Sequence, residues 1–155
     1  MIVKKYTAFL DDARPIPQRD VWIRSAWGDA PISYVQDHEF LTNATFFDVK
    51  VNKWEIDKRA SFDTPDDVWI RVEINRRENT QHNHDNFSKN PHENAKVLIH
   101  FDMDTPCGEM DYVYYLSLIA ALMEIRKNTV VCDDDGKICG ADELKSEIER
   151  KLRVT

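Results

Sequence analysis

The segment from Met110 to Lys127, MDYVYYLSLIAALMEIRK, is the most apolar stretch of the chain and constrains the fold more than any other. Its apolar residues fall on nearly every side of a helical wheel, which predicts a helix that other elements cover almost completely. Charge returns only at the ends, with Asp111 in the first turn and Arg126 and Lys127 in the last, as the helix dipole favours. We therefore expect the rest of the chain to pack around this helix.

The composition is that of a globular protein. With 155 residues, 42% of them hydrophobic and 32% charged, the chain is long enough for a core and too apolar for wholesale disorder. A net charge of −7 disfavours nucleic-acid binding, which requires a basic face. The longest uncharged run, from Tyr112 to Met123, is too short for a membrane span. Three cysteines without a CxxC pair, and an opening unlike a signal peptide, predict a cytoplasmic protein.

Alternating hydrophobic and polar residues predict several strands. The clearest is Val68–Asn75, in which every second residue is Val or Ile and the residues between are polar or Trp, as in an antiparallel strand with one wet face. Further strands are expected at residues 3–10, 21–26, 46–56, 95–103 and 129–132. The hydrophobic parity switches within residues 46–56, so we expect either a bulge near Lys53 or a strand covered on both faces.

The remaining segments complete the fold prediction. Residues 134–136 predict a tight turn, and residues 141–152 predict an amphipathic helix. Residues 76–94 are polar and predict a long mobile loop. The order of elements predicts one α+β domain over residues 1–155, with a mostly antiparallel sheet covered on one face by the long apolar helix and the C-terminal amphipathic helix.

One pentapeptide, Asp-Val-Trp-Ile-Arg, occurs twice, at residues 20–24 and 67–71. A repeat of this length in so short a chain indicates either two equivalent strands that arose by duplication or a coincidence. The flanking residues match poorly, and the sequence leaves both readings open.

The histidine-rich part of the polar loop is one candidate for chemistry. His82, His84 and His92, together with Asp85, offer imidazole and carboxylate ligands of the kind that zinc prefers. Their spacing matches no zinc motif, and histidines in polar loops usually meet solvent. We therefore predict no metal ion and no cofactor.

Catalytic motifs give no stronger signal. The chain contains no GxSxG, HExxH or SxxK sequence. A reactive thiolate at Cys107 would need a nearby base such as His100, so a partly buried thiol is the simpler interpretation. The aspartate-rich turn at residues 133–136 would place Val131 where an EF-hand loop requires its first carboxylate, which favours a hairpin turn.

Phe9-Leu10-Asp11-Asp12-Ala13-Arg14-Pro15 resembles the FLDDxRP opening of the cyclic-phosphate receiver-like family, in which the paired aspartates line an acidic pocket. Phe101-Asp102-Met103-Asp104, followed by Tyr112-Val113, is similar to that family's second acidic motif. The gap between the motifs is too long, no His-Ser-x-Asn segment follows, and helices between parallel strands are not predicted. This resemblance implies an alternative function, a metal-dependent phosphate-binding or receiver-like enzyme that uses Asp11, Asp12 and either Asp102 or Asp104.

Residues 110–150 carry a second resemblance. An apolar helix, the strand Val130-Val131, the acidic turn Asp134-Asp135-Gly136-Lys137-Ile138 and then Ala141-Asp142-Glu143-Leu144-Lys145 look like the closing block of bacterial polymorphic-toxin immunity families of the contact-dependent inhibition type. This resemblance implies a small, acidic, cytosolic α+β protein that binds a toxin domain and has no catalytic activity.

Together with the negative charge, this resemblance leads us to expect a non-enzymatic immunity protein that occludes the active site of a basic, nuclease-like toxin domain. Its acidic loops would steer the partner, and tryptophans would anchor it. We expect no nucleic-acid or membrane partner. The residues expected to bind the partner are Asp102, Asp104, Glu109, Asp111, Asp133, Asp134, Asp135, Trp27 and Trp54.

Overall fold

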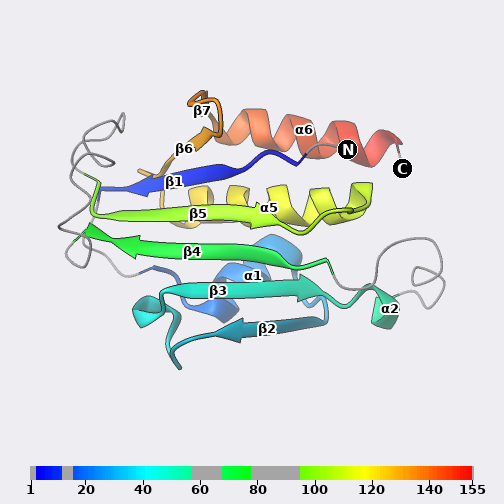
Figure 1. Ribbon diagram of the computed structural model, residues 1–155. Helices are drawn as coiled ribbons and strands as arrows, with labels where there is room; N and C mark the ends of the chain where they lie inside the picture. The colour runs from blue at the N-terminus through cyan, green and yellow to red at the C-terminus, as the bar shows by residue number, and fades with distance from the viewer. Residues whose placement is uncertain (1–2, 12–15, 57–67, 78–94, 155) are drawn as a thin grey trace.

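The computed structural model describes residues 3–11, 16–56, 68–77 and 95–154 of the chain. The strands of the described residues form one sheet, and helices form a layer behind it (Figure 1). In chain order the elements are β1 (Tyr6–Leu10), α1 (Arg19–Trp27), β2 (Ile32–Gln36), the 3-10 helix η1 (Leu41–Asn43), β3 (Phe46–Val51), α2 (Lys53–Ile56), β4 (Ile70–Arg76), β5 (Val97–Met103), α5 (Glu109–Ile125), β6 (Val130–Asp133), β7 (Ile138–Cys139) and α6 (Ala141–Val154).

All seven described strands lie in one antiparallel sheet, in the order β2-β3-β4-β5-β1-β6-β7 (Figure 1). The alternation in the sequence explains how β4 sits in it, because Val72 and Ile74 are buried while Arg71 and Glu73 are exposed. Strands β3 and β5 bury alternate residues on the same face of the sheet. The predicted α+β class and antiparallel sheet are confirmed.

Helices α1 and α5 pack on one face of this sheet, behind it in Figure 1. Trp22 of α1 is fully buried, and its ring lies 6.2 Å from that of Phe47 in β3 and 6.1 Å from that of Phe101 in β5. Tyr115 of α5 donates its hydroxyl hydrogen toward the carbonyl oxygen of Phe101 at 2.9 Å. The two helices therefore share one buried face of the sheet. On the opposite face, called the open face below, Arg71 and Glu73 are exposed, whereas Phe9, Leu98 and Cys132 form a small buried cluster.

The two flanking helices both run antiparallel to α5. The indole Nε1 of Trp22 donates to the carbonyl of Leu118 at 2.8 Å, which fixes α1 against the middle of α5. On the other side, Lys151 of α6 lies 3.2 Å from Glu109 at the start of α5, and Lys145 pairs with Glu124 near its end. Helix α6 thus packs beside α5 at the β6–β7 end of the molecule (Figure 1), and its Leu144 belongs to the same buried core as Tyr6 of β1 and Cys139 of β7.

The apolar segment at residues 110–127 forms α5, as predicted, although Arg126 and Lys127 follow the helix instead of lying in its last turn. Its buried residues occupy most of the helix surface because sheet, α1 and α6 surround it. In the described parts of the chain, no helix combines the length and the apolar content that crossing a membrane requires.

The predicted strand at residues 21–26 is wrong, because these residues belong to helix α1. The β-branched and tryptophan residues that suggested a strand instead place Trp22 and Ile23 in the core. Gly28 ends the helix with a positive φ of 64°, a conformation that glycine adopts without steric cost, and its N–H bonds to Arg24 O at 2.9 Å.

The parity switch near Lys53 also has a different cause from the predicted bulge. Strand β3 ends at Val51, and the short helix α2 begins at Lys53. Strand β2, at Ile32–Gln36, was not predicted at all. The predicted polar loop at 76–94 lies outside the described residues except for residues 76–77, so its three histidines and Asp85 do too.

Candidate binding surfaces

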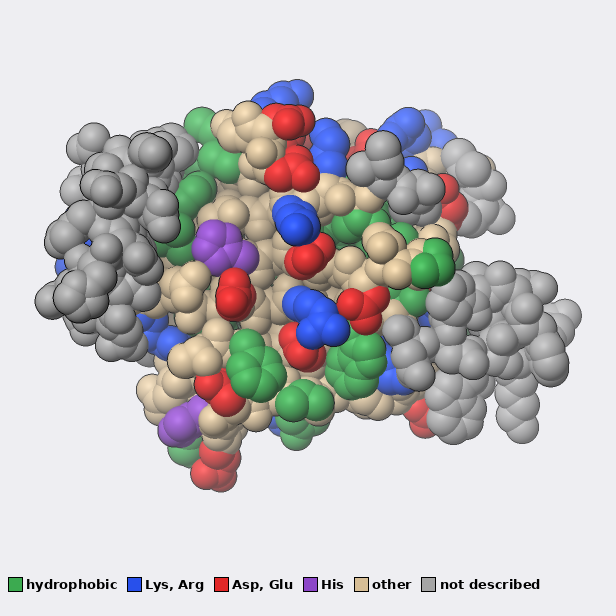
Figure 2. Space-filling view, in the orientation of Figure 1, with side chains coloured by type: hydrophobic (Ala, Val, Ile, Leu, Met, Phe, Trp, Pro, Cys, Tyr) green, Lys and Arg blue, Asp and Glu red, His purple; other side chains and the backbone are tan. Residues whose placement is uncertain are grey.

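The acidic residues expected to bind a partner lie on three separate parts of the molecule. Asp102 and Asp104 belong to the open face of the sheet, where acidic and basic side chains alternate across the strands (Figure 2). The Arg71 guanidinium lies 3.5 Å from Asp48 and 3.3 Å from Asp104, and Lys5 lies 3.8 Å from Asp102. Because these charges largely neutralise one another, the open face offers a cationic partner little net attraction.

Glu109 and Asp111 lie at the start of α5 and both have partners within the chain. Asp111 is 6% exposed, and its carboxylate accepts the N–H of Gly108 at 2.8 Å and lies 2.8 Å from the Lys53 ammonium. The first contact caps the helix, and the second links α5 to α2. Glu109 lies 3.2 Å from Lys151. Asp111 therefore has an internal structural role and is not available at the surface.

Of the three aspartates at the β6–β7 turn, one has an internal structural role and two are exposed. Asp133 is buried, and its Oδ1 accepts the N–H groups of Asp135 at 3.0 Å and Lys137 at 2.9 Å, which closes the predicted hairpin turn. One carboxylate oxygen of each of Asp133, Asp134 and Asp135 lies within 4.8 Å of the others. The turn hydrogen bonds account for the position of Asp133, and only Asp134 and Asp135 of this group are exposed.

Of the two tryptophans expected as anchors, Trp27 has an internal role. Trp27 is partly buried, packs edge-on against Tyr114, and donates its indole N–H to the Tyr114 carbonyl at 2.9 Å. It therefore helps to hold α1 against α5. Trp54 lies in α2, and its side chain is outside the described residues.

The carboxylates of the alternative, receiver-like function lie far apart. Because β1 and β5 are antiparallel, Asp11, which follows β1, is at the opposite end of the sheet from Asp102 and Asp104. Asp102 contacts Lys5, and the six residue steps from Lys5 to Asp11, at about 3.4 Å each, span roughly 20 Å. One Mg²⁺, whose ligands lie at about 2.1 Å, cannot bridge that distance. Asp12 lies outside the described residues.

The thiol considered as a nucleophile also lacks an activating environment. Burial raises the pKa of Cys107, and the negative charge of Asp111 raises it further. His100 lies on the open face, where its Nδ1 is 3.0 Å from the Thr7 hydroxyl, and burial lowers its pKa. A raised thiol pKa keeps Cys107 protonated at neutral pH, the reverse of what nucleophilic catalysis needs.

Exposed hydrophobic side chains instead concentrate around β2, at one edge of the sheet. Of the seven large hydrophobic residues that are exposed in the described part of the chain, Tyr34, Val35 and Phe40 lie on β2 or in the loop after it, at 45%, 51% and 50% exposure. In Figure 2, hydrophobic side chains are gathered over β2 and β3 at the lower edge of the open face. Three acidic residues, Asp20, Asp37 and Glu39, lie near Tyr34 and Phe40. We define the β2 surface as Asp20, Tyr34, Val35, Asp37, Glu39 and Phe40.

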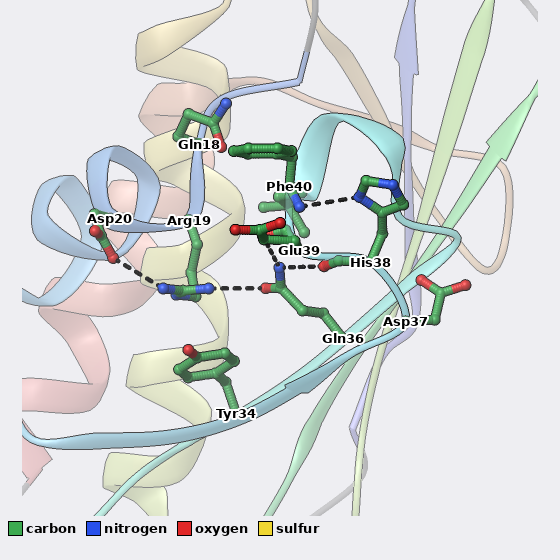
Figure 3. A pocket seen from close by; sticks show the side chains of 10 residues that line it. Gln18, Arg19, Asp20, Tyr34, Gln36, Asp37, His38, Glu39 and Phe40 are labelled. Carbon is green, nitrogen blue, oxygen red and sulfur yellow. Dashed lines mark hydrogen bonds and ion pairs between the residues drawn. The ribbon is translucent and has the colours of Figure 1, made fainter.

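A hollow of about 620 Å³ lies within this surface, between the start of α1 and the loop after β2 (Figure 3). Arg19 crosses it, with the guanidinium carbon 3.8 Å from the centre of the Tyr34 ring, Nη1 3.1 Å from Gln36 Oε1, and Nη2 3.5 Å from Asp20. Gln36 in turn donates to the carbonyl of Glu39 at 3.0 Å. These contacts fix the walls of the hollow before any partner arrives.

The hollow is acidic. Asp37 accepts hydrogen bonds from the Thr45 hydroxyl and the N–H groups of Thr45 and Phe46, and the Thr45 hydroxyl is the main cause of its lowered pKa. Among the described residues, the Glu39 carboxylate forms no ion pair and Asp20 pairs only with Arg19. Asp20, Asp37 and Glu39 therefore line the hollow together with Arg19, and of these three acidic residues Asp20 contacts the Arg19 guanidinium.

Sequence reasoning missed this surface because it missed β2. The signal was short, since Ile32–Gln36 contains only two alternations after the break at residues 28–31. A second hollow, of about 610 Å³, lies between β1 and α6, but four basic and four acidic side chains line it.

Comparisons of the chain with known protein families, curated proteins and solved structures find no match.

Proposed function

We propose that this protein is a cytoplasmic, non-enzymatic binding protein of the bacterial immunity class, which neutralises a basic, nuclease-like toxin domain by covering its active site. The β2 surface is the observation that supports this proposal. It combines exposed aromatic and aliphatic side chains with carboxylates at one sheet edge, which is the composition of a protein-binding site.

The proposed mechanism has two stages. The net charge of −7, with carboxylates at the rim of the β2 surface, draws a basic domain toward this edge and raises the association rate. Tyr34, Val35 and Phe40 then lose their exposure to water against the partner and slow dissociation. Occlusion needs no chemistry from this chain, because bulk placed over the toxin's active site is enough to exclude its substrate.

The first test is capture and neutralisation. The tagged chain is used to capture proteins from the native organism's lysate at low and moderate salt, and the captured protein is then expressed with and without this chain. We expect one stoichiometric basic partner that arrests growth alone and not in the presence of this chain. A captured protein whose toxicity is unchanged by the chain, or no partner at either salt, would overturn the proposal.

A thermal-melting series addresses the alternative function. A metal that binds the native state raises the melting temperature. We expect the same melting temperature with and without Mg²⁺, Mn²⁺, Ca²⁺ or Zn²⁺, because the candidate carboxylates Asp11 and Asp102 lie at opposite ends of β1 and β5. A concentration-dependent rise with one of these ions would favour the metal-dependent alternative.

A further inference from the structure

We infer that the β2 edge binds its partner by strand addition: an extended basic segment of the partner pairs with β2 and places a lysine or arginine side chain in the hollow beside Glu39 and Phe40. This inference rests on the proposed function and specifies the binding mode. It does not follow from the resemblance to immunity proteins, because that resemblance covers residues 110–150 and β2 lies outside it.

The first support is the character of β2 as an edge strand. Among the described strands it pairs with β3 on one side only, and at five residues it is longer than β7, the other edge. Proteins usually protect such edges with charged residues, proline or a bulge. The sequence ISYVQ contains no charged residue and no proline, so its backbone remains suited to pairing with another chain.

The second support is the alternation of side chains along β2. In the register with β3, Tyr34 pairs with buried Val49, so it projects to the helix side, whereas Val35 pairs with Asp48 and projects to the open face. A strand added beside β2 would alternate in the same way. Its helix-side residues would enter the hollow, and its open-face residues would lie near Val35 and Asp48.

The third support is that the hollow already binds a guanidinium, that of Arg19. The chain's own side chain shows the recognition elements, namely the face of the Tyr34 ring and the Gln36 amide oxygen. Glu39 remains without an ion pair among the described residues, beside the exposed ring of Phe40. A second cation from a partner therefore meets both a carboxylate and an aromatic ring.

A peptide titration tests this binding mode directly. The probe is a blocked peptide of about seven alternating lysine and valine residues, long enough to cover the five residues of β2, added to ¹⁵N-labelled protein. We expect amide shift changes and slowed hydrogen exchange centred on Ile32–Gln36. A peptide N-methylated at every second residue cannot donate hydrogen bonds along one edge, and we expect it to bind at least about tenfold more weakly. We expect the same loss of affinity for a peptide of alternating glutamate and valine, because its charge is reversed. Equal binding of the N-methylated peptide, or shifts centred elsewhere, would overturn the inference.

Charge-neutral variants separate this surface from the acidic turn. Asp20→Asn with Glu39→Gln removes two exposed charges at the hollow, and Asp134→Asn with Asp135→Asn removes two at the β6–β7 turn as a matched control. We expect the first pair to weaken the lysine–valine peptide roughly tenfold and the control pair to change its affinity less than about twofold. The reverse result would move the binding site to the turn.

The same variants distinguish failure of the inference from failure of the proposed function. If the captured toxin is neutralised equally by the protein with Asp20→Asn and Glu39→Gln and by the wild type, the immunity function stands and the β2 site is wrong. If the peptide binds β2 as expected but the lysate yields no neutralised partner, strand addition stands and the immunity function is wrong.

Discussion

The Lys53–Asp111 pair gives the sharpest test of how the helical layer is held together. The ammonium and the carboxylate are 2.8 Å apart, and their side chains are only 12% and 6% exposed. Asp111 also caps α5 through the N–H of Gly108. A partner-binding role and a structural role for Asp111 therefore predict different outcomes when the pair is broken.

The structure sets the size of the expected effect. Removing one member of a buried ion pair costs about 3–5 kcal/mol because the other charge is left without compensation. For Lys53→Met we expect about 3 kcal/mol, the lower end, since the Asp111 carboxylate keeps its hydrogen bond to Gly108 and the favourable end of the helix dipole. For Asp111→Ala we expect about 4 kcal/mol, because the loss of the cap adds about 1 kcal/mol.

A double-mutant cycle isolates the pair from these other contributions. The variant with Lys53→Met and Asp111→Asn has neither charge and retains an oxygen that caps α5, so we expect it to lie within about 1.5 kcal/mol of the wild type. Urea unfolding followed by tryptophan fluorescence measures each free energy. A Lys53→Met protein within about 0.5 kcal/mol of the wild type, or additive effects of Lys53→Met and Asp111→Asn, would refute the reasoning.

Two further predictions concern the core and the open face. For Trp22→Phe we expect the free energy of unfolding to fall by about 2–3 kcal/mol, because the smaller ring leaves a cavity between Phe47 and Phe101 and loses the hydrogen bond to Leu118. Urea unfolding measures this change, and a fall of less than about 1 kcal/mol would contradict it. Burial lowers the pKa of His100 below its ordinary 6.5, so the unfolded chain takes up the proton first and stability falls as the pH drops through about 6.5. In His100→Gln this part of the pH dependence should disappear from unfolding curves measured between about pH 5.5 and 7.5, and an unchanged slope would refute it.

Strict periodicity made much of the fold predictable from the sequence. The pattern of β4 specifies its buried face, and both β4 and α5 have hydrophobic patterns long enough to specify the element. Strand β2 and helix α1 do not. Strand β2 is five residues long, and α1 buries mainly Trp22 and Ile23, so its helical state depends on contacts with α5 and the sheet that no local pattern records.

The candidate site was harder to predict, because an acidic residue in a sequence does not reveal whether its charge is already paired. Asp111 and Asp133 lie where local structure requires a hydrogen-bond acceptor, at a helix start and in a tight turn. Glu39, which has no ion pair among the described residues, follows a strand that the sequence did not predict. A sequence pattern can therefore locate acidic groups, but only the fold shows which of them remain available to a partner.

The repeated pentapeptide shows why the prediction of α1 failed. Residues 20–24 lie in a helix, whereas in the second copy Ile70 and Arg71 begin β4 and Asp67 lies outside the described residues. The interpretation of two equivalent strands is therefore wrong. In the helix the core receives Trp22 and Ile23, and in the strand region it receives Val68 and Ile70, while Trp69 lies half-buried beneath Lys50 on the open face.

The same five residues therefore satisfy both periodicities, and their neighbours decide between them. The second copy continues into Val72 and Ile74, which extend the two-residue period and are buried when the backbone is extended. The first copy continues into Ser25, Ala26 and Trp27, which break that period, and Gly28 then ends the helix. A periodic run of five residues does not determine its secondary structure. Such a segment becomes a helix or a strand according to whether the residues that follow it bury their apolar side chains with a helical or a two-residue period.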